Sequence, residues 1–135
     1  MSIQDNKKLC QKFYDAINRE DFDALDDLCH KDFVFYSQVD TPKPGVEGFV
    51  NSEKSAFDAF HSFEFPVELM IAEGDKVGVY LIFHAKGQKK PTMGAEPHGK
   101  DVRISVFCLL TIKEGKIIEK RAHFDVADIR AQLAA

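Results

Sequence analysis

Apolar residues in the first half of the chain recur at helical spacing. From Ile3 to Ile17 they fall on one side of a helix, at intervals of three to four residues. The same period over residues 22–29 predicts a second, short helix, and the apolar positions from Phe49 to Phe60 suggest a third. Between them, the short aromatic run Phe33–Ser37 predicts a strand that enters an irregular loop, because prolines and glycines follow it over residues 42–48.

The pattern changes from helical to extended near Pro66, and the rest of the chain predicts long strands joined by turns. Gly74 and Gly115 each lie in a short polar break where a tight hairpin needs a residue that tolerates positive φ. The strands on either side of each break are therefore expected to pair antiparallel. Helices followed by strands is the order of an α+β domain whose helices cover one face of a sheet. The predicted strands are Pro66–Ala72, Val77–His84, Val102–Ile112 and Ile117–Phe124.

One long interruption separates the predicted strands. Residues 86–100 are rich in glycine, proline and lysine, and we expect them to form a mobile flap beside the sheet. The lysines make this flap basic within an acidic protein, which would steer an anionic substrate toward it. Lysines of an ordinary solvated loop are the alternative explanation.

Length and charge narrow the class of protein. A chain of 135 residues is long enough for one continuous core and too short for two, so we predict a single domain over residues 1–135. The formal net charge of -4 gives no long-range attraction to phosphate backbones or anionic lipid, and we expect neither a nucleic-acid nor a membrane partner. No apolar run approaches the ~20 residues that cross a bilayer, and the first eight residues are polar. These features predict a cytoplasmic protein.

The cysteines suggest neither a disulfide framework nor a zinc site. Cys10, Cys29 and Cys108 are odd in number, far apart and without CxxC spacing, so we predict three buried, reduced thiols. The chain also lacks a GxSxG elbow and a glycine-rich phosphate loop. The residues therefore give little support to nucleophilic catalysis.

The last predicted strand carries the most concentrated group of ionisable residues. Because side chains alternate along a strand, Glu119, Arg121, His123 and Asp125 share one face. Same-face neighbours lie ~6.6 Å apart, so His123 is within reach of either neighbour or of a ligand that lies across both. Such a row can position a ligand and exchange protons with it.

Two simpler explanations of this row remain open. A charged stripe is usually the solvated face of an antiparallel sheet. Asp125 also precedes a helical pattern that runs from Ile129 to Leu133, with Asp128 three residues on, which is typical of a helix N-cap. A carboxylate that is held by helix amides is a weaker base than one in an apolar pocket.

Two further residues outside this row are candidates for ligand contact. His84 ends a predicted strand where the flap begins, although a structural histidine fits the same position. Tyr14 lies on the apolar side of the first helix and can offer a hydroxyl to a ligand, or can simply pack in the core. The twelve phenylalanines are expected to be mostly core, and they would give any cavity aromatic walls that suit a flat organic ligand.

Several stretches of the chain together resemble the SnoaL-like polyketide cyclases, or ester cyclases, of the nuclear-transport-factor-2-like superfamily. The run from Phe13 to Leu28 is similar to the opening helix pair of that family, and Ile71–Val77 is similar to its hairpin turn into a central strand. The segments 84–87 and 93–100 are similar to its histidine-containing strand end and its flap. Glu114–Glu119, followed by Asp125 and then Gln132–Leu133, is similar to its final hairpin and tail.

The resemblance implies a cone-shaped, curved antiparallel sheet with N-terminal helices on its concave face. It also implies a cofactor-free and metal-free enzyme in which an aspartate at the position of Asp125 shuttles a proton during intramolecular aldol closure of a polyketide ester. Two departures suggest a smaller or anionic ligand: Arg121 stands where the family usually has tryptophan, and residues 88–91 lengthen the flap. The site that we expect comprises Asp125, His123 and His84 for catalysis, and Tyr14, Arg121, Glu119 and Met93 for substrate binding.

Three hypotheses follow from the sequence. The first is a cofactor-independent acid/base enzyme that acts on a small carbonyl or polyketide-like compound in an apolar pocket. The second is a non-catalytic binding protein of the same fold, in which Arg121 and the flap lysines fix an anionic group. The third is a chiefly structural protein whose pocket is filled by phenylalanines. By the same resemblance, we expect a homodimer that pairs through the outer face of the sheet.

Overall fold

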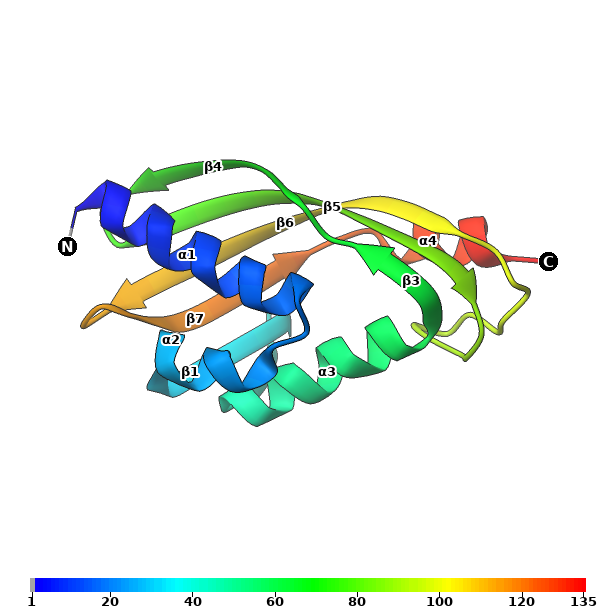
Figure 1. Cartoon of the computed structure of the whole chain (residues 1–135), viewed down its shortest axis with the longest axis horizontal. Coiled ribbons are helices and arrows are strands. Elements are labelled where there is room, and N and C mark those ends of the chain that lie inside the picture. Colours follow the sequence, from blue (N-terminus) through cyan, green and yellow to red (C-terminus); the bar gives the residue numbers. More distant parts are fainter. Residues whose placement is uncertain (1) are drawn as a thin grey trace.

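A computed structural model describes residues 2–135 and contains helices on one side of a curved, open sheet (Figure 1). The first helix, α1, begins at a capping box in which the Ser2 hydroxyl accepts a hydrogen bond from the Asp5 amide at 3.0 Å. The elements in chain order are α1 (Ile3–Asn18), a 3₁₀ turn η1 (Phe22–Ala24), α2 (Leu25–Leu28), β1 (Cys29–Gln38), β2 (Thr41–Pro44), α3 (Val46–Asp58), β3 (Phe60–Glu64), β4 (Val67–Glu73), β5 (Lys76–Gln88), β6 (Val102–Lys113), β7 (Lys116–His123) and α4 (Val126–Leu133).

The seven strands form one sheet in the order β2-β1-β7-β6-β5-β3, and β4 also pairs with β5. All of these pairs are antiparallel except β1 with β7, which run parallel. The hairpins at Gly74 and Gly115 are present, and both glycines have positive φ. The predicted α+β class and its curved sheet with helices on the concave face are therefore confirmed.

Two short strands were not predicted. Strand β2 contains Pro42 and Pro44 and lies at the edge of the sheet, where a residue without an N–H group is tolerated. Strand β3 begins at Phe60, which the helical pattern had assigned to the end of the third helix. Helix α3 instead ends at Asp58, and the chain turns back to pair with β5.

The concave face of the sheet holds a core that is dominated by phenylalanine. Phe57 and Phe63 stack with ring centroids 3.9 Å apart, and Phe49 packs against Phe13 and Phe35. Aromatic pairs of this kind add stabilisation beyond their area burial. The prediction that most of the phenylalanines are core is confirmed.

All three cysteines are buried and free, as predicted. Burial raises the pKa of the Cys10 thiol to about 12, and burial followed by the nearby Asp26 does the same for Cys29. At neutral pH these two side chains are thiols and pack as small apolar groups.

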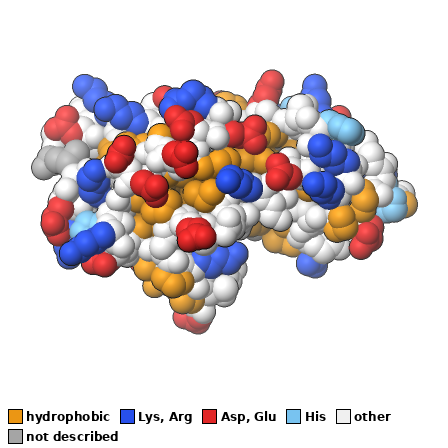
Figure 2. Space-filling view, turned by 60° about the horizontal axis from the view of Figure 1, so that its bottom comes forward, with side chains coloured by type: hydrophobic (Ala, Val, Ile, Leu, Met, Phe, Trp, Pro, Cys, Tyr) orange, Lys and Arg blue, Asp and Glu red, His pale blue; other side chains and the backbone are white. Residues whose placement is uncertain are grey.

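The surface mixes both charges. On the face turned forward in Figure 2, acidic and basic side chains are interspersed and apolar atoms lie between them. Within residues 2–135, no helix combines the length and hydropathy that a bilayer-spanning segment requires.

Candidate active site

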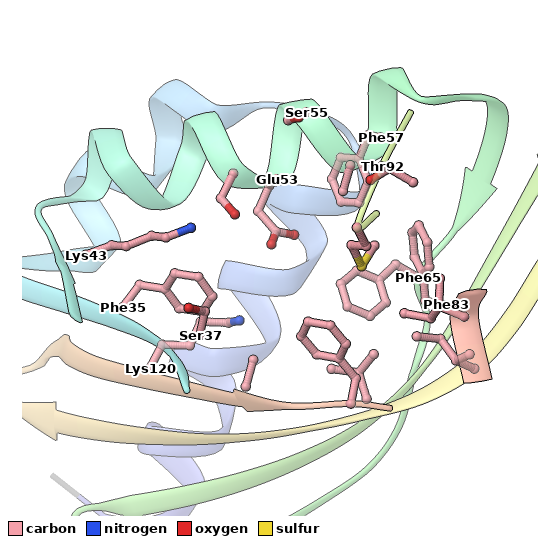
Figure 3. Close-up of a pocket in the computed structure, with 18 residues that line it drawn as sticks. Phe35, Ser37, Lys43, Glu53, Ser55, Phe57, Phe65, Phe83, Thr92 and Lys120 are labelled. Atoms are coloured by element: carbon pink, nitrogen blue, oxygen red, sulfur yellow. The ribbon is translucent and has the colours of Figure 1, made fainter. Parts of the chain in front are cut away.

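A cavity of about 360 Å³ lies between helix α3 and the concave face of the sheet (Figure 3). This volume falls within the range of small-molecule sites. Strands β1, β2, β5, β6 and β7 contribute to its walls, together with the loop before β4, the flap and α4. The lining residues are Phe35, Ser37, Lys43, Ser52, Glu53, Ser55, Ala56, Phe57, Phe65, Phe83, Thr92, Met93, Ile104, Val106, Lys120, Ala122, Phe124 and Ile129.

Glu53 projects from α3 into this cavity. Phe49, Glu53 and Phe57 are four residues apart, so they share the face of the helix that packs toward the sheet. Burial raises the pKa of the Glu53 carboxyl, and the ammonium groups of Lys120 and Lys43 oppose that rise without cancelling it. A carboxyl whose pKa is raised toward neutrality is suited to give and take protons.

Lys120 points into the same cavity from β7 and is only 3% exposed. Its Nζ lies 4.9 Å from the ring centroid of Phe35 and 4.8 Å from that of Phe49, with Tyr14 at 6.0 Å. Ring faces at these distances attract a cation. The lysine side chains that donate hydrogen bonds within residues 2–135 are Lys76 and Lys116, and Lys120 donates none. Within residues 2–135, neither Lys120 nor Glu53 forms an ion pair at a distance of 4.0 Å or less.

The charged residues of the cavity lie toward one end. In Figure 3, Lys43, Glu53, Ser37 and Lys120 lie toward one end, and the rings of Phe57, Phe65 and Phe83 lie toward the other. Such a cavity suits a ligand with an aromatic or apolar body and a polar group at one end.

The predicted orientation of the last strand is wrong. Lys120, Ala122 and Phe124 line the cavity, whereas the odd-numbered row from Glu119 to Asp125 is absent from its lining. The cause is a β-bulge: Thr111 faces Glu119 but Ile112 faces Ile117, so Ile118 is an extra residue on β7. One extra residue reverses which side chains point inward, so Ile117 is buried before the bulge and Lys120 after it.

Glu119 and Arg121 form an ion pair on the outer face of the sheet. Nη2 of Arg121 donates to Oε1 of Glu119 at 3.1 Å, and the guanidinium carbon lies 3.9 Å from the centroid of the Tyr36 ring. Tyr36 and Arg121 are register partners on the parallel strands β1 and β7. His123 lies further along the same face, exposed and opposite Phe107 of β6.

Asp125 is exposed and caps helix α4. Its Oδ1 accepts a hydrogen bond from the Asp128 amide at 3.1 Å, which is the capping alternative that the sequence left open. At the other end of α4, the Gln132 side chain bonds both the amide and the carbonyl of Arg103 on β6. Asp125 therefore caps the first turn of α4, and Gln132 attaches the last turn of the helix to the sheet.

His84 and Tyr14, two of the remaining predicted residues, are both absent from the lining of the cavity. His84 is half-buried on the outer side of β5, in register with Glu64 and Arg103. Tyr14 is fully buried in the core, where its hydroxyl has no hydrogen-bond partner among the described residues. Burial, with the nearby Cys108 as the next cause, raises the pKa of Tyr14 well above its ordinary value.

Met93, the last predicted residue, does line the cavity, and the flap that carries it is held in place. Nε of Arg130 on α4 donates to the Met93 carbonyl at 2.8 Å. The side chain of Gln88 donates to the carbonyls of Lys90 and Ala95 at 3.0 and 2.9 Å. The flap thus forms one wall of the cavity instead of lying free beside the sheet.

Sequence comparison places the chain in a family. The family model of the SnoaL-like polyketide cyclases matches residues 8–133. The chain belongs to this family. A comparison with curated proteins finds no significant match.

Solved structures of SnoaL-like proteins share the fold over nearly the whole chain. A candidate SnoaL-like polyketide cyclase from Jannaschia sp. CCS1 is 22% identical with a TM-score of 0.89, covering 100% of this chain and 96% of its own. AclR, a candidate hydroxylase from Streptomyces galilaeus, is 24% identical with a TM-score of 0.84, covering 98% and 86%. A SnoaL-like polyketide cyclase from Agrobacterium tumefaciens is 18% identical with a TM-score of 0.81, covering 99% and 100%. At these identities the likeness shows the common fold.

Proposed function

We propose that this SnoaL-like protein is a cofactor-independent acid/base enzyme of the cyclase, aldol or isomerase type, which acts on a small carbonyl or polyketide-like compound in the cavity. One observation carries the proposal: Glu53 is the one carboxylate among the cavity-lining residues that the structure describes. Its pKa, which burial raises, supports a role in proton exchange. Membership of the family supports a cyclase-type reaction.

The proposed reaction begins with proton transfer from carbon to Glu53. The ionised carboxylate removes a proton next to the carbonyl of the ligand, the C–H bond breaks, and its electron pair passes into an enolate. In a cyclase, the enolate carbon then attacks a second carbonyl, whose C=O π bond breaks, and the alkoxide that forms takes the proton from Glu53. In an isomerase, the enolate takes the proton back from Glu53 at another position. The buried charge of Lys120 favours any negative charge in the cavity.

Asp125 is the competing proton carrier, because the family resemblance implies that role. Its neighbour Phe124 lines the cavity, but Asp125 itself is not among the lining residues. Asp125 is exposed and its carboxylate accepts a hydrogen bond from the Asp128 amide, whereas the Glu53 carboxyl is inside the cavity. We therefore assign the proton to Glu53.

Hydrogen–deuterium exchange tests this assignment directly. The aromatic ketone 2-tetralone is incubated with the protein in D₂O, and loss of its α-proton signals is followed by NMR. We expect exchange to be accelerated by the wild type, to fall by about 100-fold or more in Glu53→Gln, and to persist in Asp125→Asn. The Asn variant is a matched control because asparagine also caps helices well.

The opposite results select the alternatives. Loss of exchange in Asp125→Asn but not in Glu53→Gln would assign the proton to Asp125. Binding of 2-tetralone without accelerated exchange in the wild type would favour the non-catalytic binding protein, since the cavity would then hold a ligand without transforming it.

We also propose that the outer face of the sheet pairs two copies of the chain. Leu69, Ile71 and Phe107 are exposed there, and Ile71 and Phe107 close over Gly78, which has no side chain to separate them. Apolar side chains that gather on one face support an interaction surface. Sedimentation equilibrium of the purified chain tests for the homodimer.

A further inference from the structure

The burial of Lys120 without a hydrogen bond or a contact ion pair among the described residues is the least explained feature of the cavity. An ammonium group that leaves water loses its hydration, and proteins normally compensate that loss with a carboxylate and hydrogen bonds. Lys120 is 3% exposed, donates no hydrogen bond and has no carboxylate within 4.0 Å among the described residues; Glu53, in the same cavity, lies beyond that distance. A charge in this condition is stabilised when a ligand brings the missing anion.

The aromatic rings around Lys120 indicate which form of the side chain the cavity holds. Phe35 and Phe49 approach Nζ to within 5 Å, and the negative faces of such rings stabilise a cation and not a neutral amine. A lysine that forms a Schiff base must react as the free amine. The rings therefore favour an ammonium group that pairs with an anion over an amine that attacks a carbonyl.

A second cation lies at the same end of the cavity. Nζ of Lys43 on β2 is 5.9 Å from the centroid of the Phe35 ring. The same ring has Nζ of Lys120 at 4.9 Å from its centroid. Ser37, two residues after Phe35 on β1, adds a hydroxyl to the lining (Figure 3). Against two lysines, the lining residues that the structure describes include one carboxylate, Glu53. This end of the cavity thus carries an excess of positive charge.

We propose that Lys120, with Lys43 and Ser37, binds a carboxylate that the ligand carries before it reacts, so that the ligand is an aromatic or apolar keto acid. The phenylalanines at the opposite end receive its ring or apolar body. In calling this ligand the substrate, the inference rests on the proposed function; the binding site itself does not depend on that function. In this proposal Lys120 recognises a carboxylate that the ligand carries at all times. It is not assigned to the negative charge that forms on the ligand only during the reaction.

A pair of probes with the same shape and different charge tests this proposal. Binding of 2-naphthoate and of the neutral 2-acetylnaphthalene is measured by titration calorimetry on the full chain at one fixed salt concentration. We expect the wild type to bind 2-naphthoate about tenfold or more tightly than 2-acetylnaphthalene, because a charge-assisted contact is made only with the former. In Lys120→Met the preference should disappear through weaker binding of 2-naphthoate alone.

Two further variants keep the test decisive. Lys113→Met removes an exposed lysine outside the cavity and should leave both affinities unchanged. Lys43→Met, at a half-buried position, should reduce the preference for the anion by a smaller factor than Lys120→Met, and it supplies an answer even if Lys120→Met fails to fold.

Three results would overturn the proposal. They are equal affinity of the wild type for both probes, an undiminished preference in both lysine variants, and reductive coupling of 2-naphthaldehyde to Lys120 by cyanoborohydride, which would show a reactive amine. Failure of the carboxylate site can be distinguished from failure of the proposed function. Anion preference with unchanged proton exchange in Glu53→Gln would refute only the reaction, whereas equal probe affinity with lost exchange would refute only the carboxylate site.

Discussion

Phe35 and Lys120 are register partners on the parallel strands β1 and β7, and Nζ of Lys120 lies 4.9 Å from the centroid of the Phe35 ring. The pairing brings together two residues that are far apart in the sequence and fixes the ammonium group among aromatic rings. The cation–π contacts offset part of its lost hydration. The remainder is an energetic cost that the unliganded protein carries, and it leads to the first prediction.

Replacing Lys120 with methionine should stabilise the unliganded protein. Methionine fills a similar volume without a charge, and exchanging buried charges for apolar residues often raises the free energy of unfolding. We expect a gain of about 1 to 3 kcal/mol in urea unfolding, while Lys113→Met at an exposed position should change it by less than about 0.5 kcal/mol. A loss of stability in Lys120→Met would mean that the aromatic contacts outweigh the cost of burial.

The raised pKa of Glu53 makes the stability of the protein depend on pH. Because the folded state holds this proton more tightly than the unfolded chain does, the contribution of Glu53 is fully present below the ordinary glutamate pKa of about 4.3. It is lost as the pH rises through the higher pKa of the folded state. Glu53→Gln removes this dependence, so the variant should gain stability relative to the wild type as the pH rises from about 4 to about 8.

Unfolding free energies of both proteins across that range provide the measurement. The exposed Glu68→Gln on β4 is the control, and its difference from the wild type should stay constant with pH. A difference between Glu53→Gln and the wild type that is likewise constant would show that the Glu53 carboxyl is well solvated.

Asp125 should matter to stability through its oxygen and not through its charge. Asp125→Ala removes the acceptor of the Asp128 amide and should cost about 1 kcal/mol in unfolding free energy. Asp125→Asn keeps an acceptor at the same place and should cost only a few tenths of a kcal/mol. Equal losses in the two variants, measured by chemical denaturation, would point to the interaction of the charge with the helix dipole instead.

Arg130 should control how firmly the flap covers the cavity. Arg130→Met removes the hydrogen bond to the Met93 carbonyl while keeping an unbranched side chain of similar length. We expect faster amide hydrogen exchange over residues 89–96, detected by mass spectrometry, with the exchange of β5 and β6 unchanged. Arg19→Met, which breaks an exposed ion pair with Asp21 far from the flap in the sequence, is the control. Unaltered exchange in the flap would assign its order to Gln88 alone.

Most of the helices and strands follow from local sequence patterns. The features that the sequence did not predict depend on contacts between distant parts of the chain. The helix starting at Ile3 and the strand around Val79 have strong periods, so both appeared in the sequence. The pairing of β1 with β7 has no local signal, because it joins elements from opposite halves of the chain. Strand β2 contains two prolines, which the pattern associates with a loop.

The site was harder to predict because its charges are isolated among apolar residues. Glu53 appeared as one charge on an amphipathic helix, yet it lies four residues from both Phe49 and Phe57, which marks it as inward-facing. Lys120 likewise shares its side of β7 with the apolar residues Ala122 and Phe124. The clustered charges at Glu119, Arg121 and His123 drew attention to the opposite face. A lone charge within an apolar stripe was the better signal of a residue that lines the cavity.

The bulge at Ile118 has a consequence for how this site could be altered. Deleting that one residue would make Ile112–Ile117 and Thr111–Glu119 consecutive pairs and restore strict alternation between β6 and β7. Ile117 and Lys120 would then lie two residues apart and would both still point inward, with Glu119 and Arg121 on the outer face. The bulge is therefore what lets an odd-numbered and an even-numbered residue share the inner face of β7, and the loss of that one codon would leave the lining of the cavity unchanged.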